Sequence, residues 1–169
     1  MAVWPDKARE MRGLEAAEAH ALLRAAFGRP EEADLVIRLR RAGDMVLEIV
    51  MGDAGITAYA ALSRMVAPEG WLCLAPVAVS PALQRNRLGS RLVRAILAGA
   101  ETGLLGTVAA GPATIVVLGK PSFYARAGFS LERARRLTSP YPLDHTLIWP
   151  AGSDAPEREL VYPQAFASV

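Results

Sequence analysis

The chain of 169 residues has few of the residues on which several common chemistries depend. Its one cysteine, Cys73, excludes an intrachain disulfide and is consistent with a reducing cytoplasm. Two histidines, His20 and His145, are too few and too far apart for a metal-ligand pattern. No Gly-x-Ser-x-Gly sequence occurs, so nothing supports a serine hydrolase. The sequence therefore gives no support to a function based on a disulfide, a metal ion or a serine nucleophile.

The chain also lacks long basic and long apolar runs. The net charge is only +2, without the long basic run that nucleic-acid binding requires, and the densest cluster, at 133–136, is typical of a solvated turn. Charged residues between Asp6 and Arg12 interrupt the opening before a signal peptide develops, and no apolar run is long enough for a membrane helix. We therefore expect a cytoplasmic protein without nucleic-acid or membrane partners, while a homodimer stays open.

The remaining composition predicts one folded domain over residues 1–169. Hydrophobic residues make up 52% of the chain and charged residues 21%, an ordinary globular mixture that suffices for one sizeable core. No internal repeat, low-complexity tract or linker divides the chain.

The most informative segment is a strand that leads through a basic turn into a helix. Residues 71–79 are apolar or small at every position, which is typical of a strand covered on both faces. The sequence alternation places Leu72, Leu74, Pro76 and Ala78 on one face. Pro76 cannot donate to a ladder and so predicts a bulge or a local parting of strands. The following amphipathic helix has an apolar face, which consists of Leu88, Leu92, Val93, Ile96 and Leu97.

The turn between this strand and helix is a candidate anion site. Backbone amides in the first turn of a helix lack intrahelical acceptors, and the helix dipole adds partial positive charge there. A pyrophosphate would therefore meet hydrogen-bond donors and a favourable electrostatic field at the same place. Arg85 and Arg87 add positive charge and strengthen this preference for anions.

The other elements follow from periodicity and turn residues. Leu14, Ala17, Ala21, Leu22 and Ala25 predict a helix that stops at Gly28 and Pro30, and a second helix buries Leu35 and Leu39 and ends near Gly43. Strands at 46–51 and 56–62 form a hairpin, and further strands are expected at 113–118, 146–149 and 159–162. Between the long helix and the strand at 113, Gly103, Gly106, Gly111 and Pro112 predict a loose connection. A crossover helix between the strands at 71 and 113 requires them to be parallel, which gives an α/β fold.

Two segments resemble the GNAT superfamily of N-acetyltransferases. The first runs from Val79-Ser80-Pro81 through Gln84-Arg85-Asn86-Arg87-Leu88-Gly89-Ser90, similar to the family's pyrophosphate motif; the second runs from Val116 to Phe129 and contains Leu118-Gly119-Lys120-Pro121-Ser122-Phe123-Tyr124. These two motifs and the C-terminal segment at 161–166 are together most similar in sequence to a bacterial branch of predicted N-acetyltransferases whose substrate is unassigned. The resemblance covers most of the chain from Leu14 onward and is specific between Trp71 and Phe129.

The resemblance implies a mixed, mostly antiparallel sheet with a splayed central parallel pair and acetyl-CoA in the wedge. The residues that it assigns to the cofactor are Val77, Ala78, Val79, Gln84, Arg85, Asn86, Arg87, Leu88, Gly89 and Ser90. The pantetheine arm would pair with main-chain groups of Val77 and Val79, and an amide near Ala78 or Val79 would stabilise the oxyanion.

One position departs from the family pattern. Arg87 stands where the family has the first glycine of its Gly-x-Gly pair, and a side chain there can crowd a phosphate that normally meets bare backbone. Either the guanidinium turns toward a CoA phosphate, which we favour because Gly89 is intact, or binding is weakened and the protein is a degenerate relative.

The chemistry implied by the resemblance is direct acyl transfer to an amine. Tyr124 matches the tyrosine that protonates the CoA sulfur, although an aromatic beside Phe123 can equally be a packing residue. No general base is identifiable: Glu48, Asp144 and His145 are weak candidates more typical of surface residues, and water can replace them.

A nucleotide-binding loop and a cysteine nucleophile are less well supported by the sequence. Gly119-Lys120-Pro121-Ser122 is only superficially similar to a nucleotide P-loop, because Thr114 replaces the upstream glycine. Cys73 in an apolar strand is more typical of a core residue than of a nucleophile. The leading prediction is an N-acetyltransferase acting on a small amine or peptide amine; the alternative is a non-catalytic acyl-CoA-binding or regulatory module.

Overall fold

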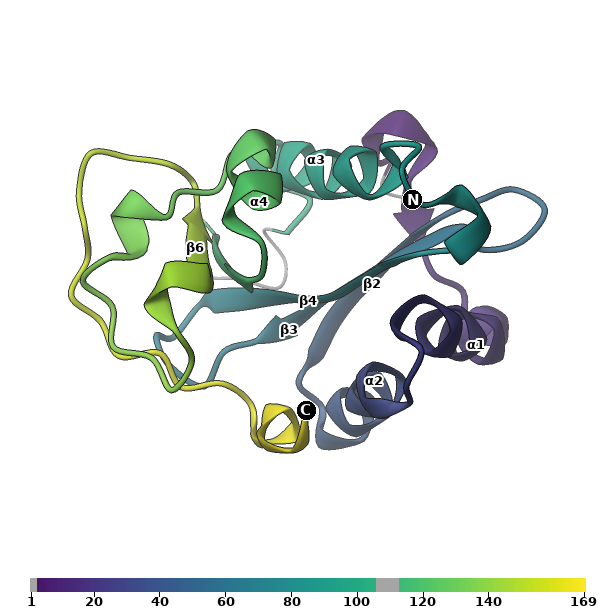
Figure 1. The fold of residues 1–169 in the computed structure, drawn as a ribbon, viewed down its shortest axis with the longest axis horizontal. Coiled ribbons are helices and arrows are strands. Elements are labelled where there is room, and N and C mark those ends of the chain that lie inside the picture. Colours follow the sequence, from purple (N-terminus) through teal and green to yellow (C-terminus); the bar gives the residue numbers. More distant parts are fainter. Residues whose placement is uncertain (1–2, 106–112) are drawn as a thin grey trace.

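The computed structural model describes residues 3–105 and 113–169, which form a six-stranded sheet between two layers of helices (Figure 1). The strands are β1 (Arg9–Glu10), β2 (Met45–Met51), β3 (Ala58–Arg64), β4 (Trp71–Val79), β5 (Thr114–Leu118) and β6 (Thr146–Trp149). The helices are α1 (Ala16–Phe27), α2 (Glu31–Ala42), α3 (Leu88–Glu101) and α4 (Pro121–Ala127). Short 3-10 turns include η2 (Gly13–Glu15), η3 (Pro81–Leu83), η4 (Glu132–Ala134) and η6 (Gln164–Ser168). Among the described residues, no helix has the length and apolarity needed to cross a bilayer.

The strands lie in sequence order, and the sheet is antiparallel except at β4 and β5. This mixed α/β architecture, with one central parallel pair, confirms the predicted fold class. In Figure 1, α3 and α4 cover one face of the sheet, and α1, α2 and the C-terminal η6 cover the other. The crossover helix α3 connects the parallel strands, which agrees with the sequence argument.

Strand β4 contains the irregularity that its proline predicts. Ala60 pairs with Val77 and Leu62 pairs with Leu74, so the single residue Ala61 lies opposite both Ala75 and Pro76. This two-against-one arrangement is a β-bulge, and it shifts the side-chain alternation by one residue. The simple alternation was therefore wrong beyond the bulge: Val77 and Val79 pack on the α3 face with Leu72 and Leu74, whereas Ala78 is in the core on the α1 face.

The first helix buries a different stripe from the predicted one. Leu14 precedes α1 in the turn η2 and is fully exposed, and Ala21 and Ala25 face solvent. The buried residues of α1 are Ala19, Leu22 and Leu23. Alanine has little hydrophobicity with which to fix the phase of a helix, so the larger pair Leu22 and Leu23 sets which face packs on the sheet.

The second and third helices confirm their predicted faces. In α2, Leu35 and Leu39 are buried and Gly43 ends the helix with a φ of 77°. In α3, the apolar face packs into the main core, where Leu92, Val93 and Ile96 are fully buried. Each such side chain contributes about 1.5–3 kcal/mol, which holds the start of α3 in a fixed position over β4.

The predictions for the remaining segments had mixed outcomes. Strands β5 and β6 and the β2–β3 hairpin are confirmed, but residues 159–162 form only isolated bridges, from Glu159 to Thr138 and from Val161 to Ala67. The short β1, which pairs with β2, was not predicted because two charged residues carry no strand pattern. Of the predicted loose connection, Gly103 is described, whereas Gly106, Gly111 and Pro112 lie outside the described residues.

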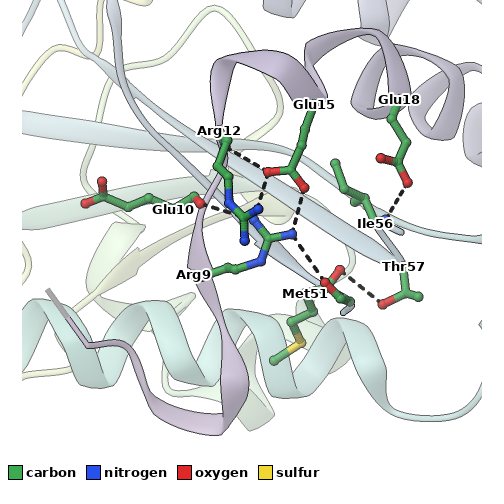
Figure 2. Close-up of polar contacts among 9 residues, drawn as sticks. Arg9, Glu10, Arg12, Glu15, Glu18, Met51, Ile56 and Thr57 are labelled. Atoms are coloured by element: carbon green, nitrogen blue, oxygen red, sulfur yellow. Dashed lines mark hydrogen bonds and ion pairs between the residues drawn. The ribbon is translucent and has the colours of Figure 1, made fainter. Parts of the chain in front are cut away.

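A polar network ties the N-terminal segment to the hairpin (Figure 2). Arg9 donates to both carboxylate oxygens of Glu15, at 2.8 and 2.7 Å, and to the carbonyl of Gly52 at 3.3 Å. Glu18 of α1 accepts the main-chain N–H of Ile56 at 2.6 Å. These contacts hold α1 and the segment before it against the turn between β2 and β3.

Candidate active site

The two parallel strands separate soon after they begin. β4 pairs with β5 only through Trp71, Leu72 and Cys73, opposite 114–116, and the rest of β4 has no pairing with β5. A cavity of about 680 Å³ opens there, between β4 and the start of α3 and α4. It is lined by Val77, Val79, Leu83, Gln84, Arg85, Arg87, Leu88, Gly89, Ser90, Arg94, Phe123, Tyr124 and Arg126. Most of the predicted cofactor residues therefore meet in one place.

The direction of the β4 main chain follows from its register with β3. Ser80 donates its N–H to the carbonyl of Thr57 at 2.9 Å, in the same register that places Ala78 opposite Tyr59. Because bonded residues alternate along an antiparallel ladder, Ala78 directs its main-chain groups to β3, and Val77 and Val79 direct theirs to the opening. The side-chain amide of Gln84 accordingly reaches the carbonyl of Val79 at 3.2 Å.

This geometry changes the prediction for Ala78. Its side chain is 4% exposed and belongs to the core on the far face, and its N–H is turned toward β3. The oxyanion donor expected at Ala78 or Val79 is thus available at Val79 alone. The physical reason is the bulge at Pro76, because it shifts the alternation of β4 by one residue. The sequence predicted the position of this irregularity but not the shift.

The turn before α3 presents unpaired amides. The first helical bond within α3 is the one from Arg91 N–H to the Arg87 carbonyl, at 3.0 Å, and no side chain caps this end. In the part of the chain that the structure describes, the N–H groups of Leu88, Gly89 and Ser90 have no acceptor. Such a helix start attracts anions through its donors and its dipole.

Two arginines in this turn have left-handed backbone. Arg85 has a φ of 73° and Arg87, the residue before the helix, has a φ of 60°. This conformation costs a non-glycine residue about 1–2 kcal/mol, and such strain concentrates at functional sites. Arg87 thus keeps the backbone shape that a glycine would adopt and adds a guanidinium at the cavity. Asn86, between them, is exposed and does not line the cavity.

Gly89 is required for close packing. A Cβ on this residue would lie 3.3 Å from Cγ2 of Val79 and 3.6 Å from the Phe123 ring. The absence of a side chain at position 89 therefore lets the helix start lie close to β4 without displacing Val79.

Tyr124 lies on α4 and lines the opening. Its ring packs edge-on against Phe123 and Phe129, with centroids 4.9 and 5.7 Å apart. Burial raises the pKa of Tyr124 to about 12, so the hydroxyl keeps its proton at neutral pH. Tyr124 is thus a packing aromatic that also lines the cavity, and its role as the proton donor stays a prediction.

A second cavity, of about 300 Å³, shares Val77 and Tyr124 with the first. Fifteen described residues line it, and they come from the α1–α2 corner, β4, the end of β5 and the C-terminal segment. Its aromatic members are Phe27, Tyr124, Tyr141, Tyr162 and Phe166. The sequence analysis missed this cavity, because its walls come from segments that are far apart in the chain.

Glu32, a residue of this second cavity, was also not singled out by the sequence analysis. It is only 5% exposed, lines the second cavity and accepts a hydrogen bond from Nε of Arg29 at 2.7 Å. Its place in the first turn of α2 gave it an ordinary helix-dipole explanation, so only its tertiary position distinguishes it.

The three candidate bases lie away from both of these cavities. Glu48 binds Arg40 and the hydroxyl of Tyr59, and Asp144 and His145 are exposed. Burial raises the pKa of the Cys73 thiol to about 12, so this side chain stays protonated and is not an available nucleophile.

Comparisons with known proteins agree with this geometry. No family model matches the chain. The chain is 32% identical over 127 residues to the uncharacterized N-acetyltransferase YhbS of Escherichia coli K12, and the match covers 72% of each chain.

Two solved structures of GNAT acetyltransferases are similar over nearly the whole chain. E. coli YhbS in complex with CoA superposes with a TM-score of 0.78 at 26% identity, covering 99% of this chain and 94% of that one. A Brucella melitensis GNAT acetyltransferase in complex with acetyl-CoA gives 0.73 at 29% identity, covering 94% and 96%. The chain therefore belongs to the GNAT family of N-acetyltransferases.

Proposed function

We propose that this protein transfers the acetyl group of acetyl-CoA to the primary amine of a small molecule or peptide, by direct attack of the amine in a ternary complex. One observation carries the proposal: the outward main-chain groups of Val77 and Val79 and the unpaired amides at 88–90 line the same cavity. Their spacing along one wall suits a ligand with an amide-bearing arm and an anionic diphosphate, which is what CoA provides. YhbS and the Brucella protein, crystallised with CoA and acetyl-CoA, support the choice.

Each part of the proposed transfer uses a described group. The neutral amine attacks the thioester carbonyl, and the N–H of Val79 stabilises the negative charge on oxygen. The C–S bond then breaks, and Tyr124 donates its proton to the departing thiolate, a role commonly worth about 10²- to 10⁴-fold in rate. The amine loses its proton to water, so no unique side-chain base is needed.

Arg85 and Arg87 would bind CoA phosphates from the side of the turn. Neither side chain is held by an ion pair within the described residues, and both line the cavity. Charge-assisted hydrogen bonds to phosphate would then replace the close backbone approach that a glycine at position 87 allows.

A calorimetric titration with acetyl-CoA, followed by thiol release on a panel of amines, tests the proposal. Saturable binding with amine-dependent thiol release is the expected result. Binding without release from a broad panel would instead identify a non-catalytic acyl-CoA-binding module. One domain over 1–169 and a cytoplasmic location stay predictions.

A further inference from the structure

The second cavity differs from the first in the character of its walls. Five of its fifteen lining residues are aromatic, in a chain that is only 7% aromatic. Tyr162 packs edge-on against Tyr141 with centroids 4.9 Å apart, and its ring is tilted by 58° against that of Phe166, with centroids 5.6 Å apart. The three rings form one continuous aromatic wall. Aromatic side chains of this kind favour an aromatic ligand through area burial and edge-to-face contacts.

Exposed apolar side chains gather at the same place. Phe27 and Leu118 are each 38% exposed although both are large and apolar, and both line this cavity. Phe27 ends α1 and Leu118 ends β5, so two layers of the fold each leave an apolar side chain open there. A water-exposed apolar cluster beside a reaction centre is typical of a binding site.

The two charged side chains that line the cavity, Arg29 and Glu32, are paired with each other. The carboxylate of Glu32 binds the guanidinium of Arg29, and burial of Glu32 makes that pair a fixed part of the wall. A polyamine would require several free carboxylates, and an acceptor with a phosphate or carboxylate group would require a free cation. The paired charges favour an acceptor with no charge other than its own amine.

We infer that the acceptor is an arylalkylamine: a primary amine on a short chain that ends in an aromatic ring, with the ring on the Tyr141–Tyr162–Phe166 wall and the amine toward Tyr124. This inference rests on the proposed function, because it assigns the second cavity to the acceptor. The volume of about 300 Å³ suits a molecule of this size.

Steady-state kinetics with acetyl-CoA and 2-phenylethylamine, spermidine, ethanolamine and a lysine peptide test the inference. We expect kcat/KM to be at least about tenfold higher for 2-phenylethylamine than for the other amines. Phe27→Ala should raise KM for 2-phenylethylamine about fivefold without changing KM for acetyl-CoA. Leu131→Ala is the matched control, because Leu131 is also 38% exposed but lines neither of the two cavities.

The outcomes separate the inference from the proposed function. Faster turnover of spermidine, ethanolamine or the peptide would overturn the arylalkylamine assignment and leave the transferase intact. An unchanged KM for 2-phenylethylamine in Phe27→Ala would also overturn it. If acetyl-CoA binds and no amine reacts, the transferase proposal fails. Calorimetry of 2-phenylethylamine with the CoA complex then decides the cavity assignment, which requires binding that Phe27→Ala weakens and Leu131→Ala does not.

Discussion

Gly119 lies directly against the ring of Tyr124: a Cβ at position 119 would come within 2.5 Å of Cε2 of that tyrosine. Main-chain bonds fix the glycine in turn, because its N–H donates to the carbonyl of His145 at 2.9 Å. The position of the Tyr124 ring, which lines both cavities, therefore depends on the absence of a side chain at position 119.

Gly119→Ala should displace the Tyr124 ring and lower kcat by about ten- to a hundredfold, since misplacing a catalytic group by about 1 Å has an effect of that size. Gly13→Ala is the control, because open space surrounds a Cβ at position 13. Steady-state rates and the thermal midpoint of both variants check this prediction. A kcat equal to that of the unmodified protein would mean that the ring position is unimportant.

Tyr124→Phe should reduce kcat by about 10²- to 10⁴-fold and leave the Kd for acetyl-CoA nearly unchanged, because only the proton donor is lost. With a pKa of about 12, the tyrosine should keep its proton through pH 10, and the rate should show no loss from its ionisation below that pH. Rate measurements from pH 6 to 11 and calorimetry check both parts. An unaltered rate in the phenylalanine variant would remove Tyr124 from the mechanism.

Gly89→Val should abolish acetyl-CoA binding, because position 89 has only 3.3 Å to the Val79 methyl and the branched side chain would push α3 away from β4. The outward amides of the turn would then no longer face the cavity. Ser90→Ala, which removes only a hydroxyl from the same turn, is the matched control and should keep most of the affinity. Retained binding in the valine variant would show that the diphosphate lies elsewhere.

Arg87→Gly should weaken acetyl-CoA binding about five- to tenfold through the loss of a charged contact to phosphate. Stability should change little, because relief of about 1 kcal/mol of left-handed strain is offset by the greater freedom of glycine in the unfolded chain. Calorimetry at two salt concentrations checks this, since the arginine contribution should shrink at high salt. Tighter binding in the glycine variant would instead identify Arg87 as an obstruction.

Glu15→Gln should make the protein less sensitive to acid. Hydrogen bonds from Arg9 hold the pKa of Glu15 at about 2, against an ordinary value of 4.5 (Figure 2). The carboxylate therefore contributes stability that is full above pH 4.5 and is lost as the pH falls toward 2. Denaturation between pH 7 and 2.5 should show a loss of about 1 kcal/mol in the unmodified protein that the variant lacks. Identical acid profiles would contradict the assignment.

The local sequence determined most of the elements and the cofactor side of the site. Pro76, the apolar run around it and the basic turn at 84–90 are contiguous, so their backbone consequences could be predicted from neighbouring residues. The phase of β4 could not, because one inserted residue at the bulge reverses which side chains share a face with α3. The face of α1 was likewise set by packing, since its alanines fit either side.

The cavity that we propose for the acceptor was formed by tertiary packing alone. Phe27, Glu32, Tyr141 and Tyr162 lie in segments that have no common pattern, and they meet only because α1, α2 and the C-terminal segment cover one face of the sheet (Figure 1). Sequence reports contacts between near neighbours, whereas a cavity wall depends on how distant elements pack. The chain thus specified a GNAT cofactor turn by itself, and only the fold specified what stands opposite it.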